Sequence, residues 1–213
     1  MQFWSDSFKD GGSIPAKFAF CGMDPDTRVS LSANKNPHLG WRELPAGTRS
    51  LVIICHDPDV PSSAENVNQE GKIVPAGLPR VDFFHWTLLD LPPDMLAIAE
   101  GEVSDGVTAR GKAGPDALRG ARQGLNDYSG WFAADPDMSG DYFGYDGPCP
   151  PWNDSIMHHY VFTLYALAIA QVPLAGTFAA PQVLAAIQGH VLAQASVTGQ
   201  YTLNPALAAQ QGK

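Results

Sequence analysis

The chain has 213 residues, of which 45% are hydrophobic and 16% charged, enough to bury one core in a single domain spanning residues 1–213. Thirteen Lys and Arg against twenty-two Asp and Glu leave a formal charge of -9, so the average field repels nucleic acid and anionic membrane surfaces. The hydrophobic content excludes a disordered chain, and the negative charge excludes a basic nucleic-acid-binding protein. The 21 Gly and 18 Pro residues favour strands joined by ordered loops.

The N-terminus and the cysteines bear on the cellular location. Residues 1–6 have neither the basic flank nor the apolar stretch of a secretory signal, so we expect a cytoplasmic protein. Cys21, Cys55 and Cys149 are odd in number and form no Cys-x-x-Cys pair, which predicts reduced thiols rather than a disulfide framework.

Short runs of β-branched and aromatic residues bounded by turn formers predict strands at 17–20, 51–55, 83–89 and 160–168. The run at 51–55 is continuously apolar, which is typical of a strand covered on both faces. Asp57-Pro58-Asp59 follows this run and should end the strand, because proline donates no ladder hydrogen bond.

The C-terminal part of the chain carries no Asp, Glu, Lys or Arg from 155 to 212. Gln, Pro and His residues break it into pieces shorter than the roughly 20 apolar residues of a membrane span, so we expect burial and no integral membrane association. Apolar residues at helical spacing, after a Thr177 cap and an early Pro181, predict one helix through Val183, Leu184, Ile187, Val191, Leu192 and Ala195. We also predict a short helix after 92–94 and a terminal helical turn at 205–211.

Between 99 and 151 lies a long stretch rich in Gly, Asp and Pro. Large aromatic residues that a flexible linker would not carry lie in this stretch or directly after it, among them Trp131, Phe132, Tyr142, Phe143, Tyr145 and Trp152. We therefore predict an ordered loop packed on the sheet.

Two segments place titratable groups on or beside predicted strands. Asp57 and Asp59 lie next to prolines that restrict the backbone, although Asp-Pro-Asp is also an ordinary turn sequence. His85 lies within an aromatic strand, where a histidine is more often a satisfied core residue than a functional one. Either carboxylate would favour the protonated form of this histidine if it lay beside it.

A third segment combines a Gly-Pro loop with a histidine-bearing strand. Gly147 and Pro148 belong to a loop that can present its backbone to a ligand at close range. In a strand, His158 and Tyr160 point to one face and His159 to the other, so His158 and Tyr160 share either a site or the core.

The order of these segments resembles the phosphatidylethanolamine-binding protein (PEBP) family, most closely its bacterial branch described as Raf kinase inhibitor-like. The resemblance rests on 36–41, on 50–61 with its Asp-Pro-Asp-x-Pro, on His85-Trp86, on 147–151 and on His158-x-Tyr160. It implies a mainly β, PEBP-like fold with a central antiparallel sheet and a smaller second sheet, to which we add a C-terminal helix and the long Gly/Pro-rich loop.

The resemblance also implies a small pocket that accepts phosphate-type anions or phospholipid headgroups such as phosphoethanolamine. Carried over residue by residue, its lining is Asp57, Asp59, His85, Gly147, Pro148, His158 and Tyr160. The chain departs from the family pattern by a longer insertion at 62–82 and by a loop before 147 that is longer than in the animal members. The helix that borders the pocket in the animal members has no matching motif, so acyl-chain contacts and kinase partners are not carried over.

The leading hypothesis is a non-catalytic, cofactor-free protein that binds a small anionic ligand. His85, His158, Tyr160 and backbone N–H groups near Gly147 would donate hydrogen bonds to a phosphate.

Three alternatives remain open. A metal-dependent hydrolase would use His56, Asp57, Asp59, His85 and His158. A thiol-dependent hydrolase would pair Cys149 with His158. An interaction protein that regulates a protease or kinase would keep a vestigial pocket. We also expect a homodimer through the charge-free C-terminal stretch.

Overall fold

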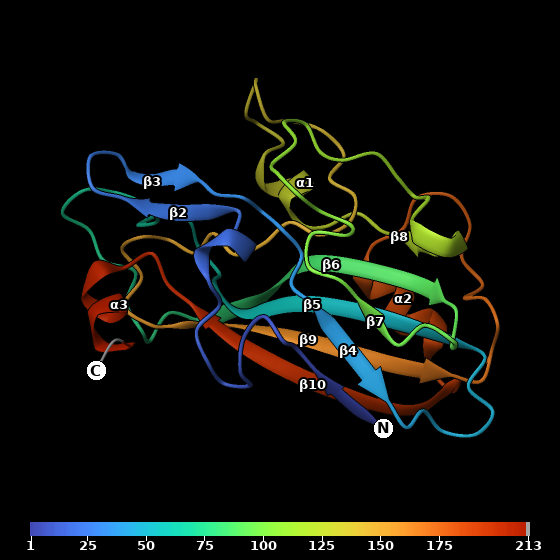
Figure 1. Ribbon diagram of the computed structural model, residues 1–213. Coiled ribbons are helices and arrows are strands. Elements are labelled where there is room, and N and C mark those ends of the chain that lie inside the picture. The colour runs from blue at the N-terminus through green and yellow to red at the C-terminus, as the bar shows by residue number, and fades with distance from the viewer. Residues whose placement is uncertain (212–213) are drawn as a thin grey trace.

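The computed structural model describes residues 1–211 and is mainly β (Figure 1). Its strands and helices, in chain order, are β1 (Gln2–Trp4), the 3-10 helix η1 (Ala16–Phe18), β2 (Cys21–Asp24), β3 (Arg28–Leu31), β4 (Leu39–Arg42), β5 (Ser50–Pro61), β6 (Arg80–Leu91), β7 (Ala97–Ile98), the 3-10 helix η2 (Leu118–Gly120), β8 (Arg122–Gln123), α1 (Tyr128–Trp131), β9 (His158–Leu167), α2 (Ala180–Ile187), β10 (Val191–Tyr201) and α3 (Pro205–Gln211).

A central antiparallel sheet has the strand order β10-β9-β5-β6-β8. Beside it lie a three-stranded sheet in the order β1-β4-β7 and the β2–β3 hairpin. Figure 1 shows β5 in the middle of the central sheet and the hairpin displaced toward one end of it. The predicted mainly β fold, with a central antiparallel sheet and a smaller one, is confirmed.

Strand β5 is apolar on both faces because both faces of the sheet are covered. Leu51 and Ile53 belong to the larger core, which the small sheet and the loops close. Val52 and Ile54 face a second core that α2 covers with Val183 and its neighbours. The charge-free C-terminal segment supplies β9, β10 and α2, so most of it lies in the sheet and its covering helix.

The predicted end of this strand at Asp57-Pro58-Asp59 is wrong, because β5 continues to Pro61. The register with β6 shifts between Asp57 and Val60, so Pro58 falls at an irregularity of the ladder, where no N–H is required.

The strand predicted at 17–20 is also wrong. The chain forms the 3-10 helix η1 and then a bend, although Phe18 and Phe20 are fully buried. The N–H groups of Phe20 and Cys21 both donate to the carbonyl oxygen of Pro148, so this apolar run is anchored to a distant loop and not to a sheet.

The predicted helix is too long at its C-terminal end. Helix α2 stops at Ile187, and Gly189 has a φ of +80°, the left-handed conformation that commonly ends a helix. Val191 and Leu192 therefore begin β10 and not a third helical turn. The helix begins after Ala179 rather than Thr177, and the terminal turn at 205–211 is confirmed as α3.

The stretch 99–151 is an ordered loop, as predicted, and its aromatic side chains reach the core. Tyr128, Tyr142 and Tyr145 are buried in the larger core. The longest helix within the loop is α1. The short helix predicted after 92–94 is absent from the described chain, which forms a turn closed by a hydrogen bond from Met95 to Pro92.

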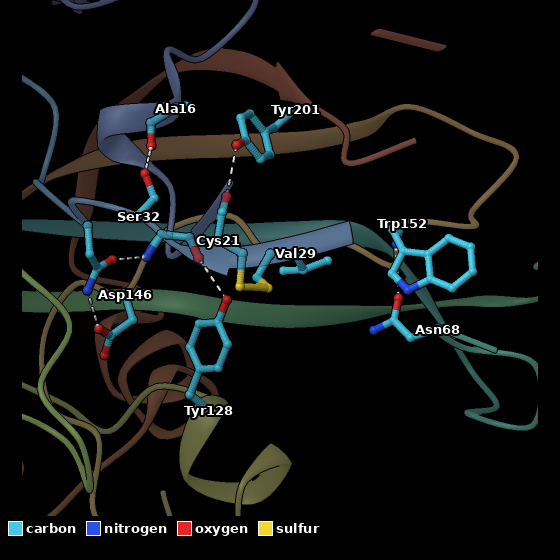
Figure 2. The surroundings of a disulfide bond; sticks show 12 residues. Ala16, Cys21, Val29, Ser32, Asn68, Tyr128, Asp146, Trp152 and Tyr201 are labelled. Atoms are coloured by element: carbon cyan, nitrogen blue, oxygen red, sulfur yellow. Dashed lines mark hydrogen bonds between the residues drawn. A yellow bond between two sulfur atoms is a disulfide. The ribbon is translucent and has the colours of Figure 1, made fainter. Parts of the chain in front are cut away.

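A disulfide joins Cys21 of β2 to Cys149, which corrects the prediction of reduced thiols. Figure 2 shows the hydroxyl groups of Tyr201 and Tyr128 beside this bridge; Tyr201 donates to the carbonyl of Cys21, and Tyr128 to that of Gly147. Sequence reasoning missed the pair because no local motif links residues 128 positions apart. The bridge ties the β2–β3 hairpin to the Gly-Pro loop.

Removing this disulfide should lower the free energy of unfolding by about 2–5 kcal/mol, because it closes a long loop in the unfolded chain. Urea unfolding of a Cys21→Ser/Cys149→Ser variant, and of the parent protein with and without dithiothreitol, measures the loss. Cys55→Ala is the control, since Cys55 is a buried free thiol outside the bridge. Equal stability of the oxidised and reduced parent would contradict the prediction.

Candidate functional site

A cavity of about 370 Å³ lies between the end of the central sheet and the surrounding loops. Four polar residues that line it are almost fully buried, and we call them the polar floor: Asp57, His85, His158 and Tyr160. Five aromatic residues form what we call the aromatic wall: Phe20, Phe83, Tyr128, Trp131 and Phe132. At the rim, Trp131 is 51% exposed and Leu31 62% exposed. The cavity is thus mainly apolar with one polar end.

Strand register brings three members of the polar floor to one face. Asp57 lies on β5, whereas His158 and Tyr160 alternate with His159 on β9, as the strand period predicts. His158 and Tyr160 are buried on the cavity side, and His159 is only partly buried.

His85 reaches the same cavity through a break in the alternation of β6. Trp86 and Leu88 pack in the larger core, whereas Phe84 packs against the second core. The pairing of β5 with β6 shifts register between Cys55 and His56, and this bulge turns His85 toward the cavity. In a regular strand, His85 would point to the face opposite that of Trp86 and would not reach the cavity.

His158 is held between two carboxylates. Its Nδ1 lies 2.7 Å from Asp57 Oδ2 and its Nε2 lies 3.1 Å from Asp154 Oδ2. Burial alone would lower the pKa of His158, but the hydrogen bonds and charges of Asp154 and Asp57 outweigh it and raise the pKa to about 9. Both ring nitrogens therefore carry protons at neutral pH and donate to the carboxylates. Arg80 completes the arrangement with a bidentate contact to Asp154.

His85 has the opposite charge state. Burial lowers its pKa to about 4, although the Asp57 charge and the Asp146 carbonyl act against this shift. Nδ1 lies 2.8 Å from the carbonyl oxygen of Asp146, which can only accept, so Nδ1 holds the single proton of the neutral ring. Nε2 is consequently a hydrogen-bond acceptor.

The structure separates Asp59 from the polar floor. Its Oδ2 accepts hydrogen bonds from the backbone N–H and the ring of His159, both on the other side of β9. The register shift between Asp57 and Val60 turns the two carboxylates to different sides. Asp59 acts on the floor only through its backbone N–H, which donates to Asp57.

Gly147 and Pro148 lie next to the cavity and hold the loops together. The N–H of Gly147 donates to Asn34 Oδ1, and its carbonyl accepts from the Tyr128 hydroxyl. A Cβ at Gly147 would lie 2.1 Å from the carbonyl oxygen of Phe18, so only glycine allows this approach. Neither residue lines the cavity.

Sequence reasoning missed Asp154, which fixes His158, and most of the aromatic wall. Asp154 belongs to no motif, and only its spacing of four residues from His158 hinted at a contact.

The structure contradicts the hypothesis of a thiol-dependent hydrolase, because the sulfur of Cys149 is bonded to that of Cys21. Within residues 1–211, no three His, Cys, Asp or Glu side chains converge as metal ligands would. No helix in the same range is both long and apolar enough to cross a bilayer.

Unfolding stability should be greatest near pH 6.5, the ordinary pKa of histidine. Above it, the raised pKa of His158 means that stability is lost as the pH rises toward 9. Below it, the lowered pKa of His85 means that stability is lost as the pH falls toward 4. Each limb amounts to roughly 3 kcal/mol, from about 1.4 kcal/mol for each pKa unit.

Urea unfolding from pH 4 to pH 9 measures both limbs of this profile. His85→Asn is the matched variant, because its amide can still donate to the Asp146 carbonyl while the titrating ring is gone. It should flatten the acid limb and keep the alkaline one. A parent protein whose stability rises from pH 6.5 to pH 9 would refute the charged state of His158.

Comparison with known proteins identifies the family of this chain. The family model for phosphatidylethanolamine-binding protein matches residues 4–202. Relatives include the UPF0098 protein YbhB of Escherichia coli, 29% identical over 95% of this chain and 100% of its own length. A UPF0098 protein of Methanothermobacter thermautotrophicus is 31% identical over 94% of this chain and 98% of its own.

Two solved structures share the fold. A PEBP homologue of Chlamydia trachomatis, CT736, matches with a TM-score of 0.63 and 28% identity over 94% of this chain and 95% of that one. YbcL of Escherichia coli matches with a TM-score of 0.66 and 24% identity over 94% and 97% of the two chains. The family model spans nearly the whole chain, and a solved structure of a PEBP homologue shares its fold. The chain therefore belongs to the phosphatidylethanolamine-binding protein family.

Proposed function

We propose that this protein of the PEBP type binds a small ligand with a phosphate-bearing headgroup, of which phosphoethanolamine is the simplest example, in the cavity at the end of the central sheet. The observation that carries the proposal is the polar floor, where four polar side chains from three strands converge at one end of an otherwise apolar cavity. Such a cavity orients a ligand by its polar end and excludes water with its walls.

Binding rather than turnover fits the chemistry of the floor. His158 is charged and donates both protons to carboxylates, so it cannot act as a general base. No activated nucleophile stands beside it among the residues that line the cavity, because Cys149 is bridged to Cys21.

Phosphoethanolamine should bind the parent protein and lose at least about 10-fold in affinity in His85→Asn, because the shorter amide does not reach the ligand at the position of the imidazole Nε2. Calorimetric titration at pH 7 measures both affinities. His159→Asn is the matched control, since His159 lies outside the cavity beside Asp59 and should leave the affinity unchanged. Equal affinities of all three proteins, or no binding to the parent, would refute the proposal.

Three finer expectations stay predictions: the regulatory role of the Raf kinase inhibitor-like branch, the homodimer and the cytoplasmic location. Light scattering at micromolar concentration tests the homodimer, and a monomer would overturn it.

The cytoplasmic location is tested by the redox state of Cys21 and Cys149 in cells lysed under acid trapping. Disulfides persist mainly in oxidising compartments, so an oxidised pair would argue against the cytoplasm.

A further inference from the structure

The β2–β3 hairpin has little packing of its own. It pairs with no other strand of the described chain and stands apart from the central sheet (Figure 1). Cys21 is the only buried side chain of the two strands, and Val29 is partly buried against the larger core. A two-stranded hairpin with so little buried surface is at best marginally stable by itself. Its position therefore depends on what fastens it to the rest of the chain.

This hairpin is also part of the cavity lining. Cys21 and Leu31, which are paired across the two strands, both line the cavity. Cys149 and the two prolines after it line the cavity from the Gly-Pro loop. The disulfide therefore joins two parts of the lining, and both of its cysteines belong to that lining. Leu31 is mostly exposed, so any movement of the hairpin changes the lining.

The far end of the hairpin is fastened only at the protein surface. Its polar contacts with the rest of the described chain come from Arg28, which pairs with Glu70 at 2.8 Å and lies over the ring of Trp152. The side chains of this ion pair are 49% and 76% exposed, and an ion pair so exposed contributes little to stability. The disulfide is therefore the strongest fastening of the hairpin.

The base of the hairpin is held independently of the disulfide. The N–H groups of Phe20 and Cys21 donate to the carbonyl oxygen of Pro148, and Phe20 is almost fully buried. The Tyr201 hydroxyl donates to the carbonyl oxygen of Cys21 (Figure 2). Loss of the disulfide would therefore release the projecting residues 22–31 and leave the base attached to the fold.

A reductant can reach the disulfide through the cavity. Cys149 is partly exposed, whereas Cys21 is 5% exposed. A thiolate of a dithiol reductant would attack the Sγ atom of Cys149, form a mixed disulfide and release Cys21 as a thiolate. The second thiol of the reductant would then displace Cys149. Two electrons and two protons pass to the protein, which gains two thiols, and the dithiol becomes a disulfide.

We propose that the Cys21–Cys149 disulfide is a redox-sensitive latch on the cavity: its reduction releases residues 22–31, opens the lining and weakens ligand binding. The opening concerns the hairpin alone, whereas the loss of affinity rests on the proposed function. The oxidised protein is the closed form that binds the ligand. The reduced protein keeps the central sheet and the polar floor.

Opening of the lining lowers the affinity because the walls of the cavity exclude water from the ligand. When Cys21 and Leu31 withdraw, a bound ligand loses their apolar contacts, and solvent reaches the polar floor. Losing the contacts of one apolar side chain corresponds to about 10-fold in affinity.

The test compares the oxidised parent protein, the parent reduced with dithiothreitol, and the Cys21→Ser/Cys149→Ser variant. Cys55→Ala is the matched control, because it removes a buried thiol but keeps the disulfide and should respond to dithiothreitol as the parent does. Brief trypsin digestion followed by mass spectrometry measures opening of the hairpin at Arg28. Calorimetric titration with phosphoethanolamine at pH 7 measures the affinity of the cavity.

We expect trypsin to cleave after Arg28 at least about 10-fold faster in the reduced parent and the double variant, with the rest of the chain intact, because cleavage requires local opening of the hairpin. The affinity for phosphoethanolamine should fall about 10-fold in the same two proteins. The double variant should not respond to dithiothreitol. If this variant does not fold, the reduced parent alone provides the comparison.

Equal rates of cleavage after Arg28 in the oxidised and reduced parent would overturn the latch. Cleavage of the reduced parent at many sites at once would also overturn it, because the disulfide would then only stabilise the whole fold. Faster cleavage after Arg28 with unchanged affinity would overturn the effect on the ligand and leave the proposed function standing. Binding of phosphoethanolamine to neither form would overturn the proposed function and the effect on affinity, while the cleavage rates would still decide whether the hairpin opens.

Discussion

A row of ion-paired side chains, Arg80–Asp154–His158–Asp57, determines the polar end of the cavity. It joins β6, the segment before β9, β9 itself and β5, and only the Arg80 side chain, at 12%, is exposed to water by more than a few per cent. Removing any one member would leave an uncompensated charge in a low-dielectric environment, which typically costs 3–5 kcal/mol. His158, the most conspicuous histidine of the sequence, is thus a structural cation that holds the Asp57 side chain in place.

This arrangement changes the meaning of the family motif. Asp57, His158 and Tyr160 were expected to share a site on the strength of strand parity and family resemblance, and the structure brings them together. Their identity alone, however, says nothing about which of them donates and which accepts. That assignment depends on Asp154 and on the Asp146 carbonyl, neither of which belongs to the motif. A pair of histidines that reads as two phosphate donors consists instead of a saturated cation and a neutral acceptor.

The success and failure of sequence reasoning follow from the range of the interactions concerned. The alternation of His158, His159 and Tyr160 is a local property of a strand, and it predicted correctly which side chains share a face. The bulge that turns His85 toward the cavity, and the one that separates Asp59 from Asp57, depend on how two strands pair. The Cys21–Cys149 bridge depends on the whole fold, since it joins residues 128 positions apart. Gly189 is a residue type that commonly ends a helix, but the apolar residues that continue at helical spacing beyond it led to the prediction of a longer helix.

The loops after β5 and before Gly147 contribute to the lining of the cavity. The insertion after Pro61 supplies Ala64, Val67 and Asn68 to the lining, and the long loop before Gly147 supplies Tyr128 through Met138. The strands thus provide the polar floor, while the inserted loops provide much of the apolar wall and the rim. Because the floor is electrically balanced, discrimination between ligands must come from the direction of hydrogen bonds and from the shape of the wall, and not from net charge. A change in these loops would alter the wall and leave the floor intact, because the strands carry the polar residues.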